Sequence, residues 1–214
     1  MIFLAFEGLD GSGKSSLMKQ LEDHLVQQKI QITKTREPGG TVIGDQLRSI
    51  ILTRNQEKSH SPTARTELLL YEASRAQHVD LVIRPALAAG RWVLCDRFTG
   101  SSIAFQAGGR LISVEQVRWL NDFAIDGVQP HLNILLDLTV DESKKRRRHR
   151  QNAGGSEEDR IESEAESFHN RVREGFLKES KIDSKKWLVL DASQTPDQLF
   201  QTLVCELRGR KWLA

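Results

Sequence analysis

The chain has 214 residues, of which 38% are hydrophobic and 28% charged, a composition typical of a soluble globular domain with one sizeable core. Its 31 basic and 29 acidic residues leave a formal net charge of +2, which excludes a global field that would hold a nucleic-acid backbone. No 18-residue apolar stretch and no basic leader occur, so we expect a single domain over residues 1–214 without a membrane segment. Cys95 and Cys205 lie far apart in the sequence and do not have the spacing of metal ligands or of a redox pair. We therefore expect both thiols to be reduced and the protein to be cytoplasmic.

The first element is an apolar run at 2–6, which predicts a strand and leads into the segment FEGLDGSGKSS at 6–16. This segment matches G-x-x-x-x-G-K-[ST], in which backbone N–H groups surround a β-phosphate while lysine and hydroxyl reach the γ-phosphate and Mg²⁺. Leucines at 17, 21 and 25 then predict a helix with one apolar face. The expected phosphate-binding residues are Gly8, Leu9, Asp10, Gly11, Ser12, Gly13, Lys14, Ser15 and Ser16.

A dinucleotide-binding loop is the main alternative for this segment. Its G-x-G-x-x-G pattern fails at Ser16, and Lys14 supplies a charge that the pattern lacks. The loop therefore favours a nucleoside triphosphate over NAD.

Four further apolar runs predict strands at 30–35, 92–95, 132–136 and 187–190, and they are nearly continuous, as in parallel strands covered on both faces. Helical patterns occupy the segments between them. The expected helices cover 63–89, 113–125, 140–150, 158–180 and 196–207. The alternation predicts a doubly wound α/β sheet, and together with the phosphate-loop motif it indicates a fold of the P-loop NTPase type: a five-stranded parallel sheet with helices on both faces and ligands at the carboxyl ends of the strands.

Asp96 and Arg97 close the third predicted strand, so both side chains should emerge at the ligand edge of the sheet. An acidic residue there is suited to hold Mg²⁺, directly or through water, together with the Ser15 hydroxyl. An ordinary ion pair between the two neighbours is the alternative.

Seven segments in order extend the pattern over nearly the whole chain: FEGLDGSGKSS, TREPGG, LRSIIL, SRAQHV, VIRPAL, WVLCDRF and AFQAGGR. Together they resemble the bacterial thymidylate kinase family. The resemblance implies an ATP-dependent phosphotransferase that uses Mg²⁺, acts on dTMP and forms a homodimer.

The resemblance also implies an acceptor site. Arg48 and Arg97 would hold the acceptor phosphate, Asp10 would contact the sugar, Tyr71 would stack on the base, and Arg75 would reach a base carbonyl. The loop residues that would contact the base and crowd the 2′ position are Ser101, Phe105 and Gln106. The residues alone also allow Tyr71 to be a core-edge aromatic with Arg75 in an ion pair, and QAGGR to be a flexible loop.

The cationic stretch KKRRRHRQNAGGSEED at 144–159 follows a capping box, Thr139 with Glu142, that predicts a helix start. By composition it is a solvated helix end or a nucleic-acid patch, with a mobile segment after it. The resemblance implies a lid at about 145–160 that supplies the transition-state cation, because Ser12 stands where one branch of the family has arginine. Arg160 of DRIE is the first candidate, followed by Arg147, Arg148 and Arg150, and Arg146 would lie over the adenine.

The residues expected to be catalytic are Asp10, Lys14, Arg97 and Arg160. The resulting hypothesis is ATP-dependent phosphorylation of dTMP to dTDP by positioning and electrostatics. The alternatives are another pyrimidine acceptor such as dUMP, a deoxynucleoside acceptor, or an ATP-binding regulatory module without turnover. A nucleic-acid binder based on 144–150 comes last.

Overall fold

The computed structural model describes residues 1–54, 57, 60–155 and 157–213; residue 156, inside the expected lid, lies outside this description. Its centre is a sheet of five parallel strands in the order β2-β3-β1-β4-β5. The strands are β1 (Phe3–Glu7), β2 (Ile32–Arg36), β3 (Trp92–Asp96), β4 (Leu132–Asp137) and β5 (Trp187–Asp191). Each strand falls on a predicted apolar run, so the α/β fold with a parallel sheet is confirmed.

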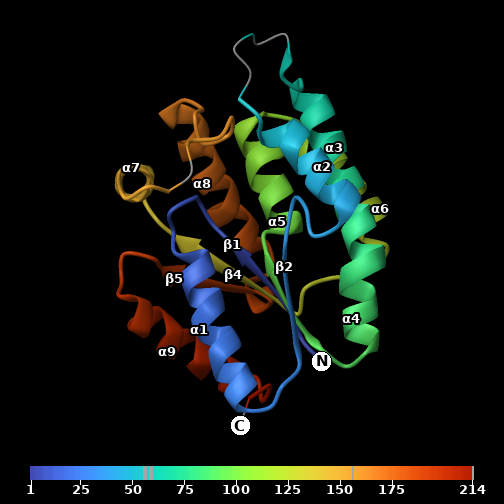
Figure 1. Ribbon diagram of the computed structural model, residues 1–214, viewed down its shortest axis with the longest axis vertical. Coiled ribbons are helices and arrows are strands. Elements are labelled where there is room, and N and C mark those ends of the chain that lie inside the picture. Colours follow the sequence, from blue (N-terminus) through green and yellow to red (C-terminus); the bar gives the residue numbers. More distant parts are fainter. Residues whose placement is uncertain (55–56, 58–59, 156, 214) are drawn as a thin grey trace.

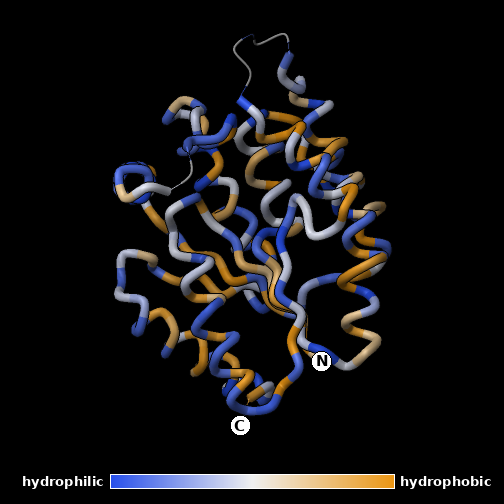
Figure 2. Tube along the Cα trace, viewed as in Figure 1, coloured by the Kyte–Doolittle hydropathy of each residue, from blue (hydrophilic) through white to orange (hydrophobic). Residues whose placement is uncertain are grey.

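Helices cover both faces of the sheet (Figure 1). One face packs against α1 (Lys14–Gln27) and α9 (Pro196–Gly209) through a leucine-rich cluster. The other face packs against the π-helix η2 (Val79–Ile83), α4 (Arg84–Ala88), the π-helix η3 (Ile103–Gly109), α6 (Val114–Ile125) and α8 (Glu166–Ile182). The remaining elements are α2 (Val42–Leu52), α3 (Ala64–His78), α5 (Thr99–Ser102), α7 (Val140–Asn152) and the 3₁₀ turn η4 (Ser184–Lys186). Figure 2 shows the central strands in the hydrophobic colours.

The expectation that all strands are covered on both faces is wrong for the two edge strands. β1, β3 and β4 are buried along almost their whole length, whereas β2 has only half-buried and exposed residues and β5 has a single buried residue, Leu190. Each edge strand has a neighbour on one side only, so part of its surface remains in water.

The predicted helix at 63–89 is confirmed as a helical stretch, but it is not one regular helix. α3 passes into η2 and then into α4, whose second residue is Pro85. Proline has no N–H to donate and its ring crowds the preceding turn. The backbone hydrogen bonds just before it therefore change from the α-helical i→i+4 pattern to the i→i+5 pattern of a π-helix.

The interpretation of QAGGR as a flexible loop is wrong, because residues 99–109 form α5 and η3. A Cβ on Gly109 would lie 2.5 Å from a ring carbon of Phe168 in α8. The glycine therefore permits close helix packing here.

The predicted helix at 158–180 begins only at Glu166. The Asp159 carboxylate accepts hydrogen bonds from the backbone N–H groups of Ile161 and Glu162, both at 2.8 Å. This local turn competes with helix formation and keeps residues 159–163 beside the ligand edge.

Candidate active site

The phosphate loop links β1 to α1 at the carboxyl edge of the sheet. Gly8 has φ +131°, and a Cβ there would lie 2.5 Å from the carbonyl oxygen of Leu136, so only glycine fits without strain. Gly13 precedes α1 and supplies no side-chain cap. The first N–H groups of α1 are therefore left to bind an anion.

Lys14 lies folded over this loop and is buried. Its Nζ donates to the carbonyl oxygens of Gly8 and Leu9, both at 3.1 Å, and lies 3.9 Å from Oδ1 of Asp10. Burial and the nearby Arg97 guanidinium lower the pKa of Lys14, while the surrounding carboxylates oppose this shift. The loop thus holds a desolvated ammonium where the motif requires one.

The residues expected to hold Mg²⁺ lie together. Ser15 and Asp96 line one surface depression at the carboxyl edge, beside Thr35 of β2. The Oδ1 atom of Asp96 is buried and has no hydrogen-bond partner among the residues that the structure describes. An unpaired carboxylate oxygen near a hydroxyl fits a hard, oxygen-seeking cation.

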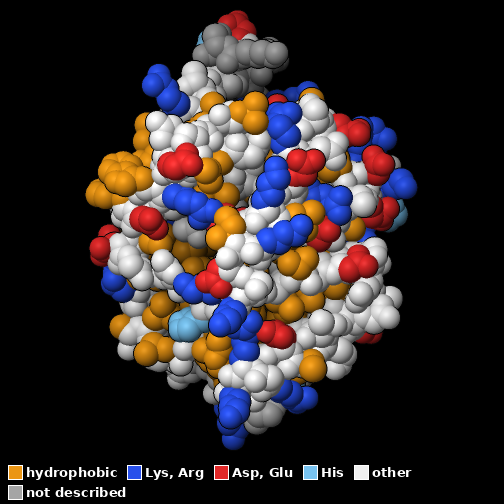
Figure 3. Space-filling model, turned by 180° about the vertical axis from the view of Figure 1, so that it is seen from behind, with side chains coloured by type: hydrophobic (Ala, Val, Ile, Leu, Met, Phe, Trp, Pro, Cys, Tyr) orange, Lys and Arg blue, Asp and Glu red, His pale blue; other side chains and the backbone are white. Residues whose placement is uncertain are grey.

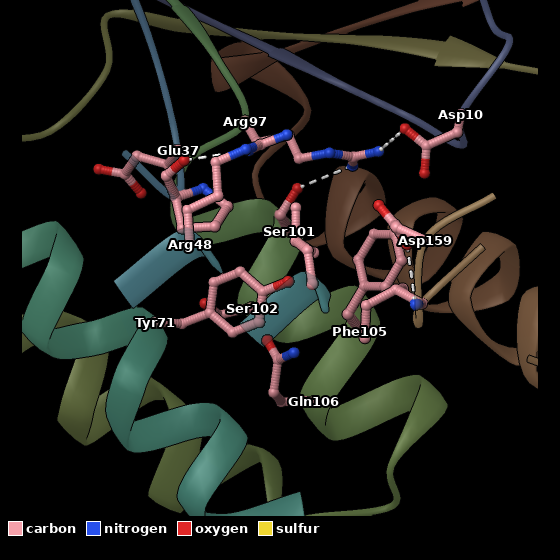
Figure 4. Close-up of a pocket in the computed structure, with 13 residues that line it drawn as sticks. Asp10, Glu37, Arg48, Tyr71, Arg97, Ser101, Ser102, Phe105, Gln106 and Asp159 are labelled. Carbon is pink, nitrogen blue, oxygen red and sulfur yellow. Dashed lines mark hydrogen bonds and ion pairs between the residues drawn. The ribbon is translucent and has the colours of Figure 1, made fainter. Parts of the chain in front are cut away.

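A second pocket opens next to the phosphate loop (Figure 4). The predicted acceptor residues that line it are Asp10, Arg48, Tyr71, Arg97, Ser101, Phe105 and Gln106. Arg48 comes from α2, Tyr71 from α3 and Gln106 from η3, so residues distant in sequence converge here.

Arg97 joins the phosphate loop to this second pocket. It follows β3 with φ +70°, and its Nη2 donates to Oδ1 of Asp10 at 2.7 Å. Its Nη1 donates to the carbonyl oxygen of Gly8 at 3.0 Å and to Oγ of Ser101 at 3.2 Å, and its guanidinium lies 5.0 Å from the Phe105 ring centre. Burial raises the pKa of Asp10, but Arg97 and Lys14 outweigh burial and hold it below its usual value.

Glu7 holds the turn that presents Arg97. Its fully buried carboxylate accepts hydrogen bonds from the N–H of Phe98 at 2.9 Å, the N–H of Ser101 at 3.2 Å and the Ser101 hydroxyl at 2.5 Å. Burial raises the pKa of Glu7 from 4.5 to about 7, against the smaller effects of Ser101 and Arg97.

This raised pKa predicts a pH dependence of folding stability. Between pH 4.5 and 7 the folded protein keeps a proton on Glu7 that the unfolded chain has released, so stability should fall as pH rises through this window. The expected loss across this window is about 3.5 kcal/mol, at about 1.4 kcal/mol per pH unit. Urea unfolding at pH 5 and pH 8 should show a fall in wild type that Glu7→Gln lacks; equal pH dependence in both would contradict the assignment.

The structure does not bring Arg75 to the pocket wall. Its buried guanidinium donates to the carboxylates of Glu37 at 2.8 Å and Glu72 at 2.7 Å, and to Asn121 at 2.5 Å. It also donates to Ser102 and to the carbonyl oxygen of Phe98. Contact between Arg75 and a base therefore stays a prediction.

Three of the arginines in the predicted lid are held by acidic partners or carbonyls. Arg146 donates to Glu142 at 3.2 Å and to the carbonyl oxygen of Ala192 at 3.0 Å. It belongs to α7, which packs on the phosphate loop: a Cβ on Gly11 would lie 3.3 Å from that of Arg146. Arg147 and Arg150 pair with Glu158 and Glu162, and Arg148 is exposed.

Arg160 is directed to the acceptor side instead of the phosphate loop. Its Nε donates to the carbonyl oxygen of Ile51 and its Nη2 to Oε2 of Glu67, both at 2.7 Å. A transition-state role for Arg160 thus requires it to leave Glu67, and that role stays a prediction.

The sequence analysis missed several pocket residues. Asp159, Glu37 and Ser102 line the second pocket, and Glu67 lies behind it. Asp159 lay within the quoted DRIE segment, next to the chosen arginine, and Glu37 lay within TREPGG. Glu67 gave no signal, because its partners are distant in sequence.

The chain is similar to known proteins of one family. A family model described as Thymidylate kinase matches residues 6–203. A thymidylate kinase of Bdellovibrio bacteriovorus is 57% identical over 100% of this chain and 98% of its own length. Thymidylate kinases of Geotalea uraniireducens and Lactobacillus acidophilus are 45% and 40% identical, over 90% and 97% of this chain and 89% and 94% of theirs. In the described part of the chain, no helix is both long and apolar enough to cross a membrane.

Proposed function

Because this chain belongs to the thymidylate kinase family, we propose that it transfers the γ-phosphoryl group of ATP to dTMP, giving dTDP and ADP. The observation that carries the proposal is the contact between Arg97 and Asp10, which joins the phosphate loop to the second pocket, where the acceptor would bind. An acceptor phosphate oxygen would form the new P–O bond as the bond to the β–γ bridging oxygen breaks.

The donor would lie on residues 8–16, with Lys14 at the β- and γ-phosphates and Arg146 near the adenine. Mg²⁺ held by Ser15 and Asp96 would neutralise charge on the phosphates. The buried Asp96 Oδ1 without a hydrogen-bond partner supports this placement.

The acceptor would lie in the second pocket. Arg48 and Arg97 would bind its phosphate, Asp10 its sugar, and Tyr71 its base. Ser101, Phe105, Gln106 and Arg75 complete the predicted set, and Arg160 would swing from Glu67 toward the transferring group. Arginine suits the phosphate sites because its planar guanidinium binds phosphate through two hydrogen bonds.

One assay tests the reaction: ADP release with Mg-ATP and dTMP, dUMP, dCMP or thymidine as acceptor. We expect turnover with dTMP and none with thymidine, because Arg48 and Arg97 lack a phosphate to bind in the nucleoside. Tight ATP binding without ADP release for any monophosphate would overturn the proposal.

The homodimer that the family resemblance implies has a candidate surface on α3 and α6. Leu69, Trp119 and Phe123 are 56%, 67% and 76% exposed, and the two aromatic rings stack with centres 6.2 Å apart. An apolar depression lined by Leu68 and Ile112 adjoins them, and Figure 3 shows hydrophobic side chains gathered at the left edge, over α6. An apolar patch of this kind is typical of an association surface.

The expected result is a dimeric mass for wild type in light scattering, and a monomeric mass for Phe123→Glu. The introduced carboxylate would be buried without a partner in a dimer. Ile182→Glu, at an exposed apolar residue on α8, is the matched control. If Phe123→Glu is still a dimer, the interface does not lie on this surface of α3 and α6.

The cytoplasm is the proposed location. The buried Cys95 and the exposed Cys205 are both free thiols, and free thiols are typical of a reducing compartment.

A further inference from the structure

Glu67 lies at the centre of a buried polar cluster behind the acceptor pocket. Its Oε1 accepts hydrogen bonds from Nε2 of Gln106 at 3.0 Å and from Nε of Arg110 at 3.1 Å. Its Oε2 accepts from Nη2 of Arg110 at 2.9 Å and from Nη2 of Arg160 at 2.7 Å. One side chain of α3 thus connects η3 to the segment that carries Arg160.

The charge of Glu67 determines which way the Gln106 amide faces. Burial raises the pKa of Glu67, but hydrogen bonds and charge from Arg110 outweigh burial and lower it, so the carboxylate stays ionised. An ionised carboxylate only accepts hydrogen bonds, and of the two ends of a glutamine amide only the NH₂ donates. Gln106 must therefore give its NH₂ to Glu67 and turn its carbonyl oxygen away.

That carbonyl oxygen belongs to the pocket. Gln106 is 1% exposed and lines the pocket with Tyr71. Figure 4 shows the amide end of Gln106 pointing toward the Tyr71 ring. Because the NH₂ of this amide is engaged with Glu67, the carbonyl oxygen is the end that is left for a ligand in the pocket.

We propose that Glu67 is a positioning residue for base selectivity: by fixing the Gln106 amide, it makes the pocket select a pyrimidine whose N3 carries a hydrogen. Thymine and uracil have an N3–H that donates to a carbonyl oxygen, whereas N3 of cytosine is an acceptor and would face another acceptor. This inference rests on the proposed function and adds the residue behind Gln106 that sets its polarity.

The variant Glu67→Gln should reverse the polarity. The remaining oxygen of residue 67 would stay with Arg110 and Arg160, the stronger, charged donors, and the new NH₂ would face Gln106. Gln106 would then turn over, offer its oxygen to residue 67 and direct its NH₂ into the pocket.

The test is kcat/KM for dTMP, dUMP and dCMP at saturating Mg-ATP in wild type and Glu67→Gln. We expect the dTMP-to-dCMP ratio to fall about tenfold or more, mainly through KM, as for loss of one buried hydrogen bond. The dUMP value should follow that of dTMP, and the KM for ATP should not change. An equal loss for all three acceptors, with an unchanged ratio, would show a purely structural role and overturn the proposal.

Two further variants keep the proposal testable if Glu67→Gln folds poorly. Arg110→Lys is the matched control, because it disturbs the same cluster but leaves the carboxylate facing Gln106; the ratio should persist. Gln106→Met should bring the dTMP-to-dCMP ratio of kcat/KM close to one. The double variant with Glu67→Gln should show the same ratio as Gln106→Met alone. A ratio preserved in Gln106→Met, or one that Glu67→Gln still changes in that background, would overturn the proposal.

Failure of this inference is distinguishable from failure of the proposed function. If the wild-type protein turns over no pyrimidine monophosphate, both the proposed function and the role of Glu67 are wrong. If wild type phosphorylates dTMP and Glu67→Gln leaves the dTMP-to-dCMP ratio of kcat/KM unchanged, only the role of Glu67 is wrong.

Discussion

Replacing Lys14 with methionine is expected to lower kcat about a thousandfold or more. The Lys14 ammonium is buried over the phosphate loop and held by the carbonyl oxygens of Gly8 and Leu9. Charge interactions are strong in such a desolvated place, and methionine keeps the length of the side chain without the charge. Steady-state kcat with dTMP and Mg-ATP, together with a melting curve, checks this expectation.

Lys19→Met is the matched control. Lys19 lies on the same helix, α1, but is 61% exposed and pairs with Asp23. Its activity should equal that of wild type. A folded Lys14→Met enzyme with kcat within tenfold of wild type would contradict the proposed donor site.

The second large effect is expected for Arg97→Lys, which should raise the KM for dTMP by about fiftyfold and lower kcat. Hydrogen bonds to charged groups contribute about 1.5–3 kcal/mol, and lysine cannot replace a two-pronged guanidinium contact. Lysine also cannot reach Asp10, Gly8 and Ser101 at once as Arg97 does. Initial rates over a range of dTMP and ATP concentrations measure both constants.

Arg84→Lys serves as the control, because Arg84 is 43% exposed and pairs with Asp126 far from the loop. Its constants should match those of wild type. If Arg97→Lys has a KM for dTMP within threefold of wild type, Arg97 does not bind the acceptor phosphate.

The sequence was sufficient for the parts of the fold that local patterns determine. The phosphate loop, the strand before it and the leucine face of α1 follow from spacing alone. The helix start at Thr139 is also local, since its side chain accepts a hydrogen bond from the N–H of Glu142.

Long-range packing determined what the sequence did not predict. Residues 103–109 contain two glycines that favour a loop locally, yet close contact with α8 makes them helical. The proposed acceptor pocket shows the same contrast. Arg97 and Tyr71 could be predicted to lie there, whereas the Glu67–Arg160 pair joins residues 93 positions apart. No local pattern encodes such a pair.

The exposed edge strand β2 also bears on how copies of this protein can associate. Lys34 and Arg36 lie on its exposed face, and Lys34 pairs with Glu22 of α1 at 2.9 Å. A second copy that extended the sheet along β2 would bring two rows of like charge together and compete for this pair. Sheet-to-sheet polymerisation is therefore disfavoured, which leaves the contact between copies to the helices.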